Sequence, residues 1–198
     1  MSTAGIPTVG PRGIQFRSRI EAQWAYIFDH FGWTWEYEPI DLRGYIPDFI
    51  IQFENTKVLV EVKGDTDIWD RTVNTQYINK IVDSGWTGNY MIVGASYKAS
   101  HFDGWVNIGL WGGKYEDGRE GFDHLALRKT KNGDYWDLGG NEMVFDIGWY
   151  STRAPDDQRI EYNWKQTDEN GYKLFQKIWT KYKNKVQWKG TQNFSSKR

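Results

Sequence analysis

The chain of 198 residues contains no cysteine, which excludes disulfide bonds and thiolate metal ligands and suits a reducing compartment. It also lacks an apolar run near the ~20 residues that a membrane-spanning helix needs. Residues 1–13 contain Gly and Pro but no apolar signal-peptide core. We therefore expect a soluble cytoplasmic protein without a membrane partner, with a flexible segment over residues 1–13.

Several chemical signatures are also missing. There is no Gly-rich phosphate loop, no nucleophile elbow and no internal repeat. The histidines are few, and His101 and His124 lack ligand-like spacing to another histidine. A net charge of -1 argues against indiscriminate coating of nucleic acid, but not against a local basic surface, since only residues that face phosphates release counterions.

What the chain does have is a pair of short apolar segments around a polar turn. Residues 49–53 and 58–63 are rich in β-branched and aromatic residues, and residues 54–57 are polar. This pattern predicts a β-hairpin. Because side chains alternate along a strand, Glu61 and Lys63 share one face, and Asp48 lies diagonally across from them.

This convergence points to a divalent cation. Two crowded carboxylates repel, and burying either charge unpaired is costly. Mg²⁺ relieves the conflict, because it takes oxygen ligands and is commonly held by one or two carboxylates. The Val62 carbonyl is a candidate further ligand, and metal-bound water could serve as nucleophile. Lys63 would orient that water or stabilise the transition-state phosphate.

A simpler interpretation applies to each fragment alone. Glu and Lys two apart on a strand commonly form a solvated pair, and Pro-Asp commonly just begins a strand. For Glu61-Val62-Lys63 alone we favour that interpretation. With Pro47-Asp48 at the start of the preceding strand, we favour the metal site over the solvated pair.

A helix is predicted from Ser18, because Ser18 and Glu21 fit the capping box. Its buried stripe at helical spacing consists of Ile20, Trp24, Ile27 and Phe31. Glu21 borders this stripe and serves either the helix terminus or an active site. Arg17 and Arg19 flank the helix start, where they could bind a phosphate or remain solvated.

Two further helices are predicted. The first covers residues 65–83 and carries Gln76 and Lys80 one turn apart, where they could contact DNA or solvent. Residues 90–95 are predicted to form a buried strand after it. Residues 169–185 form a basic amphipathic helix. Its outer row is Lys173, Lys177 and Lys181, which is a solvated face or a contact to the DNA backbone.

The segment 101–165 is rich in Trp and Gly, and its residues 131–134 signal a hairpin turn. We expect additional β-structure here. Tryptophans such as Trp105 and Trp136 could stack on bases or sugars, or could fill a core.

The ordered set of residues 16–25, 35–39, 45–49 and 60–64 resembles the PD-(D/E)xK nuclease superfamily, in particular small nucleases of phages and mobile elements. The resemblance covers the first half of the chain. It implies a mixed sheet flanked by helices, Mg²⁺ or Mn²⁺ dependence, and hydrolysis of DNA by metal-activated water. Position by position, it makes Asp48 and Glu61 the metal ligands, Lys63 the catalytic lysine and Glu21 the acidic residue of the first helix. One subfamily carries Gln and Tyr where this chain has Gln76 and Lys80, which leaves the subfamily open.

The combined prediction is an α/β protein with a restriction-endonuclease-like core over residues 14–100. A Trp-rich β elaboration follows over 101–165, and a basic helix and tail over 166–198. The leading hypothesis is a Mg²⁺-dependent DNA endonuclease of restriction-like, homing or junction-resolving type, as a homodimer where both strands are cut. The alternative is an inactive nuclease-like module whose Trp-rich half recognises DNA, a glycan or a protein. An exonuclease is a third hypothesis.

Overall fold

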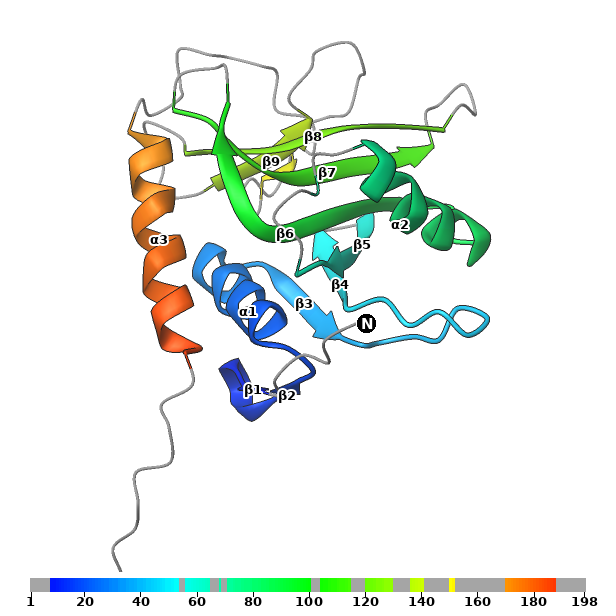
Figure 1. The fold of residues 1–198 in the computed structure, drawn as a ribbon, viewed down its shortest axis with the longest axis horizontal. Coiled ribbons are helices and arrows are strands. Elements are labelled where there is room, and N and C mark those ends of the chain that lie inside the picture. The colour runs from blue at the N-terminus through cyan, green and yellow to red at the C-terminus, as the bar shows by residue number, and fades with distance from the viewer. Residues whose placement is uncertain are drawn as a thin grey trace, which may run out of the picture.

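The computed structural model describes residues 8–53, 56–64, 68, 71–100, 104–114, 120–129, 136–140, 150–151 and 170–187. Within these ranges the protein is a mixed α/β structure (Figure 1). The helices are η1 Pro11–Gly13, α1 Arg19–Phe31, α2 Arg71–Asp83 and α3 Gly171–Lys185. The strands are β1 Thr8–Val9, β2 Gln15–Phe16, β3 Thr34–Tyr37, β4 Phe49–Phe53, β5 Thr56–Val62, β6 Asn89–Ala99, β7 Val106–Lys114, β8 Glu120–Lys129, β9 Trp136–Gly140 and β10 Tyr150–Ser151.

The main sheet has the strand order β10-β9-β8-β7-β6-β5-β4-β3. Strands β5 and β6 run parallel, and the other neighbouring strands in this order run antiparallel. The chain crosses from β5 to β6 through α2, because parallel strands need a long connection. In the predicted hairpin, Phe49 pairs with Val60 and Gln52 with Lys57.

Helix α1 has a defined start and end. The Ser18 side chain caps its first turn by accepting from the Glu21 N–H, and Gly32 ends it at φ 73, a left-handed conformation that suits glycine. The fully buried Trp24 donates its indole N–H to the Gly94 carbonyl at 3.0 Å. The Trp24 contact joins the middle of α1 to strand β6 of the sheet.

The alternation of strand residues divides the core into two layers. Val58, Val60 and Val62 pack in the larger cluster with residues of α1 and α3. Leu59 faces the other way and packs in a smaller cluster with Ile81 of α2. Figure 1 shows α1 beside α3, with α2 set apart from them. Glu61 follows Leu59 by two residues and therefore lies on the α2 side.

Most predicted elements of the first half are confirmed, with shifted ends. The elements from α1 to β6 follow in the predicted order, although β5 begins at Thr56 rather than residue 58 and β6 extends to Ala99. The predicted helix over 65–83 is wrong at its start, because Ile68 lies in a turn and α2 begins at Arg71. Ile68 is fully buried although it lies in the turn. Its apolar side chain therefore fitted the pattern of a buried helix face.

The second half contains additional strands, as expected. Strands β7 to β10 continue the main sheet, and β8 pairs with β9 around the predicted turn at 131–134, which lies outside the described residues. Trp105 and Trp111 are buried and fill the core. The side chain of Trp136, the other tryptophan named in this segment, lies outside what the structure describes. The division into a core and an elaboration stays a prediction.

The C-terminal helix is confirmed as α3. Phe175, Trp179 and Tyr182 are buried, and Lys173, Lys177 and Lys181 are exposed on the opposite side. Among the described residues, no helix combines the length and apolarity required to cross a membrane.

The contact between β6 and β7 generates a stability prediction. A Cβ on Gly109 would lie 2.0 Å from the Ile92 carbonyl oxygen, whereas a Cβ on Gly64 would meet nothing within 4 Å. We expect Gly109→Ala to lower the free energy of unfolding by about 1–3 kcal/mol, since the two backbones must separate. Gly64→Ala is the matched control and should change it little. Urea unfolding measures both, and equal stabilities would contradict this account.

Candidate active site

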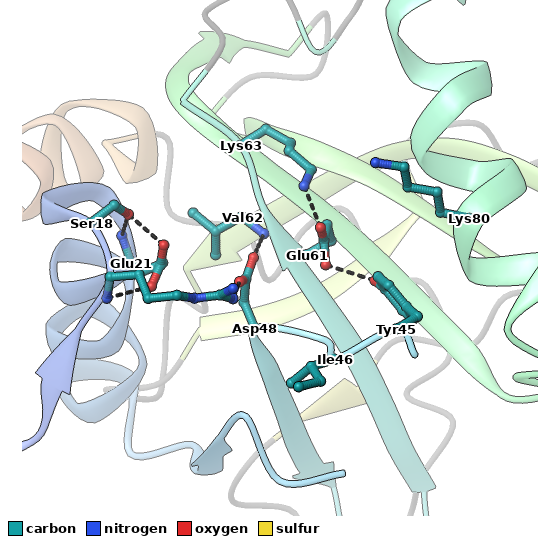
Figure 2. A pocket seen from close by; sticks show the side chains of 10 residues that line it. Ser18, Glu21, Tyr45, Ile46, Asp48, Glu61, Val62, Lys63 and Lys80 are labelled. Carbon is teal, nitrogen blue, oxygen red and sulfur yellow. Dashed lines mark hydrogen bonds and ion pairs between the residues drawn. The ribbon is translucent and has the colours of Figure 1, made fainter. Parts of the chain in front are cut away.

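The N-terminus of α1, the start of β4 and the end of β5 meet around one cavity of about 320 Å³. The lining residues are Arg17, Ser18, Glu21, Tyr45, Ile46, Asp48, Glu61, Val62, Lys63 and Lys80. Figure 2 shows Asp48 and Glu61 on neighbouring strands, with Lys63 and Lys80 near Glu61 and with Glu21 on the side of α1. The cavity therefore gathers side chains from segments far apart in the sequence.

Asp48 is buried, with 5% of its surface exposed. Its Oδ2 accepts the Val62 N–H at 2.7 Å, and its Oδ1 accepts Nη2 of Arg17 at 2.8 Å. The first contact ties the carboxylate to the end of β5. The second places a guanidinium between this carboxylate and solvent.

Glu61 is also buried and is held by two side chains. The Tyr45 hydroxyl donates to its Oε2 at 2.7 Å, and Nζ of Lys63 forms an ion pair with its Oε1. Tyr45 comes from the long segment between β3 and β4. Lys63 Nζ also lies 4.6 Å from the centre of the Tyr77 ring on α2, so the ammonium group is fixed from both sides.

Glu21 binds the chain around the start of α1. Its Oε1 accepts the Ser18 hydroxyl at 2.6 Å. Its Oε2 accepts the Tyr37 hydroxyl at 2.7 Å and the Arg17 N–H at 3.1 Å. Glu21 thus serves the start of α1, as predicted, but through the Ser18 hydroxyl and the Arg17 N–H rather than the Ser18 N–H of a capping box. The same carboxylate lines the cavity.

Burial and the neighbouring carboxylate perturb Asp48. Burial, followed by the negative charge of Glu61, raises the pKa of Asp48 from its usual value of 3.8 to about 7, although the Val62 N–H and the charge of Lys63 oppose the shift. Burial and then the charge of Glu61 raise the pKa of Tyr45 well above its usual range. The Tyr45 hydroxyl therefore keeps its proton and acts as a donor to Glu61.

The donor set can be compared with the needs of a hard divalent cation. In the part of the chain described here, no group of three or more His, Cys, Asp or Glu side chains is arranged to hold a metal ion. Mg²⁺ does not require one, because one or two carboxylates, waters and substrate oxygens suffice. A carboxylate offers about four lone-pair sites, so the contacts of Asp48 and Glu61 do not exhaust their oxygens. The two buried carboxylates and the Val62 carbonyl suit Mg²⁺ or Mn²⁺.

The structure brings together some predicted site residues and leaves others outside. Asp48, Glu61, Val62, Lys63, Glu21, Arg17 and Lys80 line the cavity. Arg19 and Gln76 are exposed and are not among the lining residues, nor are the three lysines of α3.

Three contributors were missed by the sequence analysis: Tyr37, Glu38 and Tyr45. Tyr37 donates to Glu21, Tyr45 donates to Glu61, and Glu38 pairs with Arg17 at 2.7 Å. The segments 35–39 and 45–49 already contained all three. Their roles depend on contacts across the fold, which spacing along the chain does not reveal.

Comparison of the chain with protein-family models, curated proteins and solved structures finds no match.

The raised pKa of Asp48 predicts a pH dependence of stability. The folded protein binds the proton more tightly than the unfolded chain, so without divalent cations the free energy of unfolding should fall as pH rises from about 4 to about 7. The slope attributable to Asp48 is at most about 1.4 kcal/mol per pH unit. Asp48→Asn removes this titration. Urea unfolding in EDTA across this range should show the wild type losing stability relative to Asp48→Asn, and parallel curves would contradict the assignment.

Proposed function

We propose that the protein is a Mg²⁺- or Mn²⁺-dependent DNA endonuclease with a restriction-endonuclease-like core. The carrying observation is the convergence of Asp48, Glu61 and Lys63 in one cavity at the end of the β4–β5 hairpin. The element order from α1 to β6, with β5 and β6 parallel, supports the core that the sequence resemblance implies.

Buried carboxylates are a costly way to stabilise a fold. A buried ion pair is often no more stabilising than apolar residues of similar volume. Burial and the charge of Glu61 also destabilise the charged form of Asp48, as its raised pKa indicates. Such perturbation in a cavity is typical of functional sites, and it favours a ligand that supplies positive charge.

The residues have distinct roles in this proposal. Asp48, Glu61 and the Val62 carbonyl would hold the cation. When bound, such a cation lowers the pKa of a water ligand and offsets charge that develops on the phosphoryl group. Lys63 is fixed by Glu61 and Tyr77, and its ammonium group would orient water and stabilise the negative charge of the transition state.

The surroundings of the cavity suit a phosphodiester. The N-terminus of α1 contributes the positive end of its dipole. Arg17 and Lys80 add positive charge at the edge. Glu21 keeps the Arg17 backbone and Tyr37 in place, so we assign it a positioning role. The endonuclease class and a homodimer belong to the same proposal and follow from the resemblance.

The central test is cleavage of plasmid DNA. Purified protein should nick or cut it with Mg²⁺ or Mn²⁺ and lose this activity in EDTA. Asp48→Asn, Glu61→Gln and Lys63→Met should each reduce the rate by about 100-fold or more, the scale of removing one group that stabilises the transition state. Lys57→Met, at the opposite end of β5, is the control for Lys63→Met. Variants that cut as fast as the wild type would contradict the assigned chemistry.

The Tyr45 contact gives a second test. Tyr45→Phe removes the hydroxyl that donates to Glu61 Oε2, and loss of such an orienting partner typically weakens metal binding by about 10–100-fold. Titration calorimetry with Mn²⁺ should show this loss. Tyr26→Phe is the control, because Tyr26 stacks on Tyr182 of α3 instead. Equal affinities for the wild type and Tyr45→Phe would rule out this positioning role.

A further inference from the structure

Arg17 connects two acidic residues at the edge of the cavity. Its Nη2 lies 2.8 Å from Asp48 Oδ1, and its Nε lies 2.7 Å from Glu38 Oε1. The Arg17 side chain is 58% exposed, whereas that of Asp48 is 7% exposed. The guanidinium thus approaches the buried carboxylate from the solvent side.

The contacts that hold Arg17 do not all depend on Asp48. Its backbone N–H is shared by Glu21 Oε2 and the Tyr37 hydroxyl, each at 3.1 Å. Its Nε is held by Glu38. A guanidinium that left Asp48 would therefore still be held at the edge of the cavity, with further donors of its planar fork available.

Glu38 itself is fixed in an unusual conformation. Its φ of 45 is in the left-handed region that residues other than glycine rarely adopt, and its N–H donates to the Asp48 carbonyl oxygen at 3.0 Å. Strained residues of this kind are concentrated at functional sites. In this conformation Glu38, which binds Arg17 Nε, lies next to the main chain of Asp48.

Arg17 occupies the solvent side of an oxygen that the proposed cation would use. Arginine stays charged in proteins, so it cannot yield this position by losing a proton. A divalent cation at Asp48 would repel the guanidinium, and the two charges would compete for Oδ1. Entry of the cation should therefore turn the guanidinium away from Asp48.

We propose that Arg17 is a cation-gated phosphate-binding residue. Without a divalent cation it forms an ion pair with Asp48. When the cation binds Asp48, the Arg17 guanidinium turns away from this carboxylate while Glu38 still holds its Nε. The guanidinium then offers its N–H donors to a DNA phosphate, a group that it can bind bidentately. This inference rests on the proposed function, because it needs both the cation and the DNA.

The proposal makes two opposite predictions for Arg17→Ala. In Mn²⁺ calorimetry without DNA, the variant should bind the ion about tenfold more tightly than the wild type, within the usual range of coupling between sites. In anisotropy titrations of a short DNA duplex with Ca²⁺, tested as a non-cleaving substitute, it should bind DNA about tenfold more weakly. In EDTA the two proteins should bind DNA alike.

Two further variants control the test. Lys57→Ala removes the same charge from an exposed site at the other end of β5 and should match the wild type in every titration. Arg17→Lys keeps a cation but loses the fork. It should fall between wild type and Arg17→Ala in both titrations, and it carries the test if Arg17→Ala does not fold.

The outcomes separate this inference from the proposed function. Mn²⁺ binding that is lost in Asp48→Asn but unchanged or weakened in Arg17→Ala overturns the gating role alone. Equal loss of DNA affinity in EDTA and Ca²⁺ also overturns it, because that is simple charge removal. Absence of Mn²⁺ binding in the wild type overturns the proposed function itself.

Discussion

The site depends on the burial of two like-charged carboxylates at the end of a hairpin. Asp48 and Glu61 are held by donors within the β4–β5 pair and by two donors from outside it. The outside donors are the Arg17 guanidinium, just before α1, and the Tyr45 hydroxyl, from the segment between β3 and β4. Leaving a buried carboxylate oxygen without a donor is costly. The two carboxylates therefore link the start of α1 to the sheet, and the cavity forms only when these segments are in place together.

The same strand that builds the core also builds the site. In β5, Val58, Val60 and Val62 face the α1 layer, while Leu59 faces the α2 layer. Glu61 follows Leu59 on that second face, at the end of the apolar cluster. A one-residue shift in register would move Glu61 into the larger core and the valines out of it, at a large cost in burial. Packing thus fixes the position of the carboxylate.

Local patterns explain what the sequence could predict. Helix α1 has a clear period of 3.6, and the β4–β5 hairpin is marked by β-branched and aromatic residues on either side of a polar turn. The shared face of Glu61 and Lys63 follows from the alternation of side chains along any strand. Strands β1 and β2 have two residues each, too few to show a period. The contacts of Tyr37, Glu38 and Tyr45 depend on long-range geometry. The Glu38 contact also depends on a positive φ, which a glutamate in the sequence does not predict. The strands after residue 105 were expected, but not their place in one continuous sheet.

The charge balance of the cavity argues for a ligand rather than for a finished ion-pair network. If Arg17 and Lys63 neutralised Asp48 and Glu61 fully, Asp48 would ionise near its usual pKa. Instead burial and Glu61 raise that pKa to about 7, so the donors already present compensate the charge of Asp48 only in part. A proton is therefore held more tightly at Asp48 than on a free carboxylate, and the proposed divalent cation would compete with it for the same oxygens. A doubly charged ion interacts with both carboxylates at once, whereas a proton satisfies only one. In the proposed function, the cation would therefore offset the charge of both carboxylates near neutral pH.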